Sequence, residues 1–349
     1  MRIAQVAPLH ESVPPRGYGG TERVMAYLTE ELVKLGHDVT VFASGDSITQ
    51  ARLEGIGDKA LRLGAECFDP YIPHARMFGR LARMADAFDI IHFHTDYLHF
   101  PLARLLGTPH VTTLHGRLNI PDLVPLYQEF TDIPVVSISN HQRQPVPFAD
   151  WRGTVYNGIG DDLYTFRNHR GNYLAFLGRI SPEKGVEDAI RIAERAGMDI
   201  RVGGKIDKVD QDYFRERIKP LFKQPFVEFL GELGEAEKDE LLGNAYGTLF
   251  PIAWPEPFGL VMIESMACGT PVIAYRRGSV PEVMQDGVTG WVVDHLEDAA
   301  NAVERLGSLD RYAIRRYFEE RFSAARMTHD YLAVYKGLMN PVTRRRWVA

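Results

Sequence analysis

The chain is poor in the features that mark secreted, membrane-spanning and nucleic-acid-binding proteins. Its 349 residues include only two cysteines, Cys67 and Cys268, so we expect no disulfide framework and predict a cytoplasmic location. No apolar run approaches the length that spans a bilayer, and Met1 leads directly into a strand-like segment without a signal peptide. The net charge of −6 gives no overall basic field, which argues against nucleic acid as a partner.

A recognisable metal-ligand pattern is also missing. His92 and His94 follow a strand-like segment, but neither a Cys nor a third nearby His completes a metal-ligand spacing around them. Asp210 and Asp212 form an Asp-x-Asp pair, which we interpret as helix-capping acids because we see no His or third acid that completes a hard-cation site with them. We therefore expect no metal requirement and no cofactor.

What the sequence does contain is a regular alternation of short β-branched segments and longer amphipathic ones. This alternation predicts βαβ units and parallel sheets. The expected strands of the first half are 2–7, 38–43, 89–93, 110–114 and 134–138, with helices at 20–35, 74–86, 97–106, 122–130 and 140–147. The expected strands of the second half are 172–180, 199–204, 225–233, 247–253 and 271–275, with helices at 184–196, 209–222, 235–245, 259–268 and 295–307.

The pattern restarts after a linker rich in Gly, Asn and Asp at 155–173. It therefore predicts an α/β protein with two doubly wound sheets in series, in domains 1–160 and 161–325, followed by a helical stretch at 310–338. Ligands of such sheets bind at the carboxyl ends of the strands, beside helix N-termini. The loops that connect each strand to the next helix are thus the places to search for a site.

The first such loop precedes a helix that opens with Gly19 and Gly20. Paired glycines allow the backbone to approach a ligand closely, although an ordinary glycine turn capped by Thr21 explains the pattern equally well. The loop does not match the dinucleotide-binding motif G-x-G-x-x-G, because Glu22 occupies the position of the last glycine when the motif starts at Gly17. The phosphate-binding Walker motif does not occur elsewhere in the sequence.

The second loop, in FLGRISPEKGVEDAI, places Arg179 and Lys184 near the start of a helix. Cations oppose the helix dipole at that end, so an anionic ligand is favoured over surface pairing with Glu183 or Glu187.

The third loop, in PEPFGLVMIESMACG, sets two acids around another helix start. Glu256 and Glu264 flank the backbone N–H groups of Phe258, Gly259 and Leu260. The spacing suits hydroxyls at two separated points of one elongated ligand, with phosphates between them. Dipole complementation alone would explain Glu256, but an unpaired Glu264 inside an apolar run would be costly.

Two further loops contribute histidines at strand ends. His94 is equally well interpreted as a polar residue that simply ends a strand and as a residue that contacts a ligand. His115 is the better candidate, because Gly116 follows it and lets the backbone approach a ligand.

Several motifs together resemble the retaining GT-B glycosyltransferases of family 4, also called glycosyl transferases group 1. They are YGGTE, TLHG, VYNGI, FLGRISPEKG and PEPFGLVMIESMACGTPVIAYRRGSVPEVMQDGVTGWVV. The likeness spans nearly the whole chain, and its last motif is the most specific. The chain departs from the family in Ser265, where Ala is commoner, and in the glycines of RVGGKID, which puts the shape of the donor pocket in doubt.

The resemblance implies two Rossmann-like domains facing across a cleft, with an acceptor in the first and a nucleotide-sugar donor in the second. A last helix, within about 326–349, would cross back to the first domain. It implies catalytic roles for Glu256 at the donor sugar, for Arg179 and Lys184 at the diphosphate, and for His115 near the sugar. Glu264 would hold the ribose hydroxyls.

Donor contacts are implied for Gly19 and Gly20 and for the helix start at Phe258, Gly259 and Leu260. We place His94 and Asn157 on the acceptor side. The acceptor itself and the oligomeric state are left open.

The function expected from these residues is transfer of a hexose from a UDP-sugar, with UDP-glucose as the first choice, without metal and with retention of configuration. The alternatives are a UDP-sugar epimerase or glycan phosphorylase of GT-B type, and a catalytically silent sugar-nucleotide-binding subunit. A weak contact with a membrane surface is a further possibility. It rests on the arginines of helix 74–86 and on the RRRW sequence at 344–347.

Overall fold

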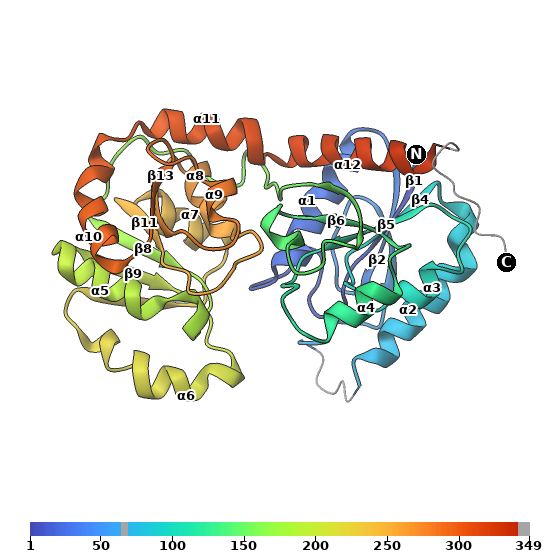
Figure 1. The fold of residues 1–349 in the computed structure, drawn as a ribbon, viewed down its shortest axis with the longest axis horizontal. Coiled ribbons are helices and arrows are strands. Elements are labelled where there is room, and N and C mark those ends of the chain that lie inside the picture. The colour runs from blue at the N-terminus through green and yellow to red at the C-terminus, as the bar shows by residue number, and fades with distance from the viewer. Residues whose placement is uncertain (64–68, 341–349) are drawn as a thin grey trace. The chain divides into compact units, whose positions relative to one another are not determined.

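The computed structural model describes residues 1–63 and 69–340 of the chain. Cys67 and the RRRW sequence at 344–347 lie outside the described residues. Two compact units make up the chain (Figure 1): the first comprises Met1–Gly158 together with the chain from Ala324 onward, and the second is Ile159–Ser323. The predicted α/β class with two doubly wound sheets is confirmed.

The first unit is built on a parallel sheet, in which seven strands are described, in the order β3-β2-β1-β4-β5-β6-β7. The strands are β1 (Arg2–Val6), β2 (Asp38–Ser44), β3 (Arg52–Ile56), β4 (Ile90–Phe93), β5 (His110–Leu114), β6 (Pro134–Ser137) and β7 (Asp150–Thr154). The central strand β1 lies between β2 and β4, with Ile3 opposite both Val39 and Ile90. From Ile3 to Val6 it is buried, and it is apolar except for Gln5, because helices cover both faces of such a sheet.

The helices of the first unit are α1 (Gly20–Lys34), α2 (Tyr71–Met84), α3 (Phe100–Ala103), α4 (Leu123–Glu129) and α12 (Ala324–Met339). Helix α12 packs beside α1, as Figure 1 shows, so the last described helix belongs to the first unit. Its inward face carries Tyr331 and Tyr335, both buried.

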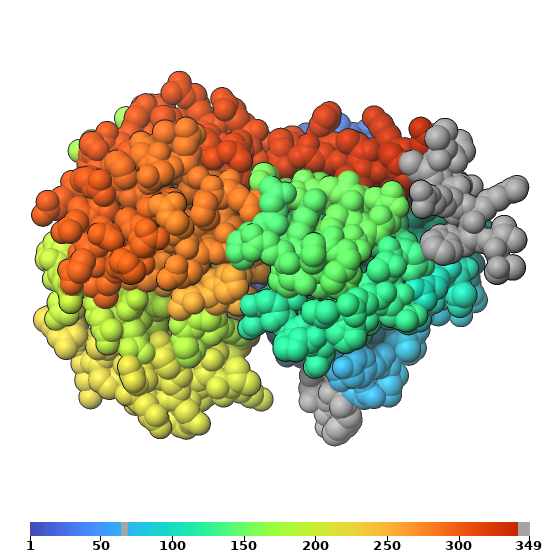
Figure 2. Space-filling view, in the orientation of Figure 1, coloured from blue at the N-terminus to red at the C-terminus, as the bar shows by residue number. Residues whose placement is uncertain are grey.

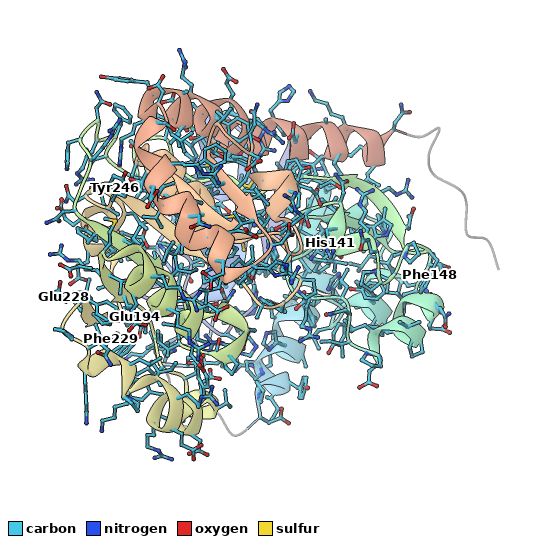
Figure 3. All side chains as sticks on the ribbon, turned by 60° about the vertical axis from the view of Figure 1, so that its left-hand side comes forward. His141, Phe148, Glu194, Glu228, Phe229 and Tyr246 are labelled. Carbon is cyan, nitrogen blue, oxygen red and sulfur yellow. The ribbon has the colours of Figure 1, made fainter. Side chains whose placement is uncertain are left out.

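The second unit contains a parallel sheet, in which six strands are described, in the order β10-β9-β8-β11-β12-β13. They are β8 (Tyr173–Leu177), β9 (Asp199–Gly203), β10 (Val227–Gly231), β11 (Gly247–Phe250), β12 (Val272–Tyr275) and β13 (Gly290–Val293). Figure 3 labels Glu228 and Phe229 on the edge strand β10. The helices are α5 (Val186–Ala196), α6 (Gln211–Tyr213), α7 (Glu235–Gly243), α8 (Leu260–Ala267), α9 (Val280–Val283), α10 (Leu296–Arg305) and α11 (Arg311–Phe322).

Some expected helices were wrong in extent. The segment 140–147 forms only a short turn at His141–Arg143, because Pro145 and Pro147 cannot donate the hydrogen bonds of a helix. The segment 209–222 is α6 followed by a wider π-type stretch at Phe214–Ile218, and Figure 2 shows it in yellow at the surface of the second unit. The stretch 310–338 divides at Ser323 into α11 and α12.

Candidate functional site

In the second unit, the loop between β8 and α5 carries Arg179 inside a group of acids. Its guanidinium hydrogen-bonds Glu183. Its Nη1 lies 3.6 Å from Oδ2 of Asp207, and its Nε lies 3.6 Å from Oδ2 of Asp210. Lys205 adds a second cation, with its Nζ 3.3 Å from Oδ1 of Asp207. The sequence favoured Arg179 as an anion ligand over surface pairing with Glu183, and the structure shows that pairing. Asp207 and Asp210 were not expected beside it.

The acids around Arg179 differ in their preference for the charged form. Burial raises the pKa of Asp210 above its ordinary value, although the charge of Arg179 opposes the shift. For Glu183, burial is outweighed by hydrogen bonds from its own backbone N–H and from Arg179, so its pKa is lowered. Asp210 and Glu183 thus shift in opposite directions although both lie beside Arg179.

Lys184 lies on the same loop as Arg179, but it contacts residues of a second loop, between β11 and α8. Its Nζ lies 2.6 Å from Oε2 of Glu256, and the indole N–H of Trp254 donates to the same oxygen at 2.7 Å. The Lys184 ammonium also lies 5.4 Å from the centre of the Trp254 ring. The structure thus brings Lys184 and Glu256 together as a largely buried ion pair. Trp254, which sequence reasoning missed, orients the carboxylate.

Backbone contacts lock these two loops to each other. Gly185 has a φ of 75°, and a Cβ placed on it would lie 2.0 Å from the carbonyl oxygen of Pro251. Next to it, the backbone N–H of Ala253 donates to the carbonyl of Glu183 at 2.9 Å. Only glycine permits both the positive φ and the close approach. Lys184 therefore sits on a loop whose position is fixed by β11.

A third loop holds the segment around Glu256 from the other side. The N–H of Ser279 donates to the carbonyl of Glu256 at 3.0 Å, and its hydroxyl donates to the carbonyl of Phe258 at 2.8 Å. Gly278, with a φ of 54°, packs so closely that a Cβ there would lie 2.4 Å from the backbone nitrogen of Glu256. The GSVPEV sequence after β12 thus positions the glutamate.

Glu264 lies on α8, whose start follows Gly259 with a φ of 81°. The residue is only 5% exposed. Within the described part of the chain, no side-chain hydrogen bond or ion pair reaches its carboxylate. An ionised carboxylate in such surroundings is costly unless a ligand supplies hydrogen-bond donors. The buried Phe258 ring packs edge-on against Phe322, which fixes the entrance to the helix.

In the first unit, the loop after β1 leads to Gly19 and Gly20 at the start of α1. A Cβ on Gly19 would lie 2.8 Å from Cβ of Pro15, so this glycine is required by packing within the loop. Burial raises the pKa of Glu22 to about 7. Its neighbour Glu11 adds like charge, although Glu11 itself pairs with Arg62 at 3.1 Å.

The predicted histidines lie at the carboxyl ends of β4 and β5 and contact each other. Nδ1 of His94 and Nε2 of His115 are 2.9 Å apart, and Nε2 of His94 is 2.8 Å from Oε1 of Gln5. Burial lowers the pKa of His115 to about 4 and that of His94 well below its ordinary value. Both imidazoles are therefore neutral at physiological pH.

Asp96 is a further residue that sequence reasoning missed. It has a φ of 49°, unusual outside glycine, and its carboxylate accepts a hydrogen bond from the backbone N–H of His115. Asn157, predicted on the acceptor side, lies one residue before the end of the first unit's main segment. Its side-chain Oδ1 is buried without a hydrogen-bond partner in the described residues.

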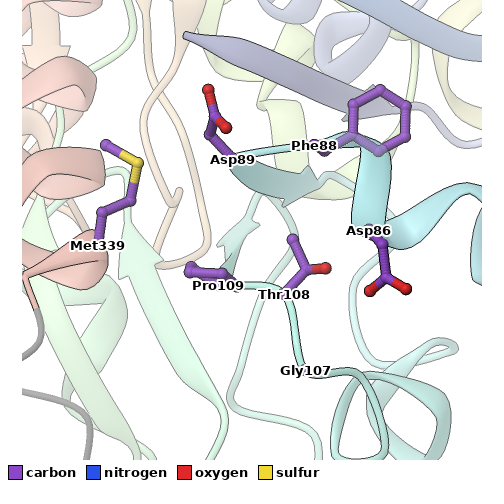
Figure 4. Close-up of a pocket in the computed structure, with 7 residues that line it drawn as sticks. All are labelled: Asp86, Phe88, Asp89, Gly107, Thr108, Pro109 and Met339. Atoms are coloured by element: carbon purple, nitrogen blue, oxygen red, sulfur yellow. The ribbon is translucent and has the colours of Figure 1, made fainter.

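Neither a metal cluster nor a membrane-spanning helix accompanies this site in the described residues. Among residues 1–63 and 69–340, no group of three or more His, Cys, Asp or Glu side chains is placed to hold a metal ion. Within the same ranges, no helix has the length and apolar character needed to cross a bilayer. A pocket in the first unit (Figure 4) is lined by Asp86, Phe88, Asp89, Gly107, Thr108, Pro109 and Met339. It lies where β4 and β5 begin, at the opposite edge of the sheet from His94 and His115.

Comparisons with known proteins bear on both units. The model for Glycosyl transferases group 1 matches residues 165–321, and the model for Glycosyltransferase Family 4 matches residues 18–151. An uncharacterised glycosyltransferase of Methanocaldococcus jannaschii is 26% identical, over 99% of this chain and 100% of the relative. The alpha-maltose-1-phosphate synthase of Mycolicibacterium smegmatis is 27% identical, over 86% and 87% of the two chains. The structure of Anabaena HepE in complex with UDP and glucose matches with a TM-score of 0.75 at 19% identity, over 96% of this chain and 99% of that chain.

Proposed function

Because this chain belongs to the group 1 glycosyltransferases of family 4 and has the GT-B fold, we propose that it moves a hexose from a nucleotide-sugar to an acceptor hydroxyl with retention of anomeric configuration. UDP-glucose is the donor that we propose first, since a structural neighbour, HepE, has been solved with UDP-glucose. The acceptor is a hydroxyl compound whose identity we leave to product analysis.

The observation that carries this proposal is the buried carboxylate of Glu264. It is 5% exposed and makes no side-chain hydrogen bond or ion pair within the described residues, so it can take hydrogen-bond donors from a ligand. The two hydroxyls of a ribose supply such donors. The start of α8 offers backbone N–H groups to a phosphate a few residues earlier.

In this account, Arg179 and Lys184 stabilise the diphosphate as it departs. The bond from the sugar C1 to the phosphate oxygen breaks, and the oxygen keeps the electron pair. The acceptor hydroxyl bonds to C1 on the same face and gives its proton to that phosphate oxygen. Fixed cations around the leaving group lower the barrier, because they are oriented before charge develops.

Lys184 already forms an ion pair with Glu256 when no donor is bound, with 2.6 Å between Nζ and Oε2. An ammonium group has three donors, so it can hold the carboxylate and still donate a hydrogen bond to a phosphate oxygen. Glu256 then faces the sugar, where a carboxylate stabilises positive charge at C1. We therefore assign Glu264 to nucleotide binding and Glu256 to the chemical step.

Two substitutions separate these roles. Glu264→Gln should weaken UDP binding about tenfold, because a hydrogen bond to a charged group is worth roughly 1.5–3 kcal/mol and a neutral one less. Glu256→Gln should leave UDP binding nearly unchanged and lower turnover about a hundredfold or more. The exposed Glu304→Gln is the matched control and should change neither. Calorimetry with UDP and steady-state rates of UDP release measure both effects, and equal losses of UDP affinity in the two site variants would overturn the assignment.

We also propose that transfer needs no divalent cation. Arg179, Lys184 and the partial positive charge of the α8 N-terminus offset the charge of the diphosphate. UDP release should therefore be the same in excess EDTA as with added magnesium or manganese. Activity that disappears with EDTA and returns with metal would show that this charge balance is incomplete.

A further inference from the structure

A chain of buried polar side chains runs through the first unit from the strand-end histidines to helix α12. Five hydrogen bonds follow the contact between His115 and His94. Nε2 of His94 lies 2.8 Å from Oε1 of Gln5, and Nε2 of Gln5 lies 3.1 Å from the hydroxyl of Tyr335. That hydroxyl lies 2.7 Å from Nδ1 of His92. The chain then passes from His92 to Thr113 at 2.7 Å and from Thr113 to Tyr331 at 2.8 Å.

The two ends of the Gln5 side chain decide the direction of the bonds that lead to His94 and His115. Its Oε1 can only accept, so His94 must carry its proton on Nε2. A neutral imidazole has one donor and one acceptor, and therefore Nδ1 of His94 accepts from Nε2–H of His115. On the other side, the Gln5 amide donates to Tyr335, whose hydroxyl donates to His92. The proton of His115 is thus placed on Nε2, and its Nδ1 is an acceptor.

Turning the Gln5 amide over would reverse the bonds to His94 and His115 and move the proton of His115 to Nδ1. The distances favour the first arrangement. The 3.1 Å separation from Tyr335 is ordinary for an N–H donor but long for a hydroxyl donor, and 2.8 Å to His94 suits N–H donation to oxygen. Burial keeps the imidazoles neutral by lowering the pKa values of His92 and His94 well below the ordinary value.

We propose that Tyr335, acting through Gln5 and His94, is a positioning residue that selects the Nε2–H form of His115 and so presents Nδ1 as a hydrogen-bond acceptor. His115 is half-buried, and no hydrogen-bond partner for its Nδ1 occurs among the described residues. That nitrogen suits a ligand hydroxyl and does not suit a phosphate oxygen, which needs a donor. The assignment of the ligand as a sugar hydroxyl rests on the proposed function. The assignment of the His115 proton to Nε2 does not depend on that function.

The two tyrosines of α12 provide a matched pair of variants. Tyr335→Phe removes the hydroxyl that both the Gln5 amide and His92 require. Gln5 then loses the partner that distinguishes its two orientations, and His115 becomes a mixture of the two forms. Tyr331→Phe removes a hydroxyl of the same helix that lies beyond Thr113, at the far end of the chain. It should leave His115 in the Nε2–H form.

The measurement is the imidazole nitrogen spectrum of histidine-labelled protein at neutral pH, with the His115 signals assigned by their loss in His115→Gln. The wild type and Tyr331→Phe should show Nε2 protonated and Nδ1 unprotonated. Tyr335→Phe should show averaged nitrogens, and if the two forms become equally populated, kcat/KM should fall about twofold. Gln5→Met is the second test if Tyr335→Phe does not fold, and it should give the same averaging.

A wild type with the His115 proton on Nδ1, or a His115 spectrum unchanged in Tyr335→Phe and Gln5→Met, would overturn the proposal. Averaging in Tyr331→Phe as strong as in Tyr335→Phe would also overturn it, because it would indicate a general loosening of α12. These spectra need no substrate. A protein without transferase activity but with the expected spectra would refute the proposed function and leave the role of Tyr335 intact.

Discussion

Replacing Glu22 with glutamine should remove a loss of stability that the protein otherwise suffers as the pH rises from about 4.5 to 7. Glu22 lies in the first turn of α1 and is only 5% exposed. Burial raises its pKa from 4.5 to about 7, against the effect of backbone N–H groups that hydrogen-bond its carboxylate. Glutamine keeps the size and the accepting oxygen of this side chain but does not titrate.

The sign follows from proton binding in the two states. Between pH 4.5 and 7 the folded protein keeps the Glu22 proton that the unfolded chain has released. The free energy of unfolding therefore falls as the pH rises through this window. Each pKa unit is worth about 1.4 kcal/mol, so the full loss is about 3 kcal/mol. Near pH 5 the two proteins should be similarly stable, and at pH 8 Glu22→Gln should be more stable by roughly 2–3 kcal/mol.

Urea denaturation of both proteins at pH 5 and pH 8 provides the test. Buried histidines such as His92 and His99 have lowered pKa values, so they make the stability of both proteins rise with pH up to their unfolded pKa. This background cancels when the variant is compared with the wild type at each pH. A difference in unfolding free energy that is the same at both pH values would refute the reasoning.

Two other changes test the loops of the second unit. Gly185→Ala should destabilise the protein by at least about 2 kcal/mol more than Gly197→Ala. Both glycines have positive φ, but only a Cβ on Gly185 would meet a backbone oxygen, at 2.0 Å. Equal losses of unfolding free energy in urea denaturation would contradict this. Asp210→Asn should tighten UDP binding about fivefold, since it removes a charge 3.6 Å from Arg179 that competes with the diphosphate. The exposed Asp212→Asn is its control, and calorimetry that gives Asp210→Asn the same or weaker affinity would show that Arg179 does not meet the phosphates.

The buried strands could be predicted from the sequence, and edge strands were the ones missed. β1 and β8 are apolar runs because helices cover both faces of a parallel sheet. The overlooked strands β3, β7 and β13 all lie at sheet edges. RLEGI and DWRGT contain glycine and charged residues, since one side of an edge strand borders solvent and needs no continuous apolar run.

The candidate site could be predicted in its residue types but not in its contacts. A carboxylate inside GLVMIESMA indicated that Glu264 needs a partner, because burial of a lone acid is costly. The pairing of Lys184 with Glu256 joins residues 72 positions apart, and local spacing carries no information about it. The same holds for Tyr335 and Gln5, which lie 330 positions apart in the sequence.

Proton NMR of the protein with UDP-glucose and a mixture of hydroxyl acceptors, recorded over time, tests the central claim most directly. The α-anomeric signal of the donor should decline while UDP appears, and a new α-glucoside signal should grow at the same rate. Glu256→Gln should slow all three changes together. A β-glucoside product would contradict retention. An intact donor, with no consumption of other nucleotide-sugars by the same protein, would contradict the assignment of this chain as an active transferase.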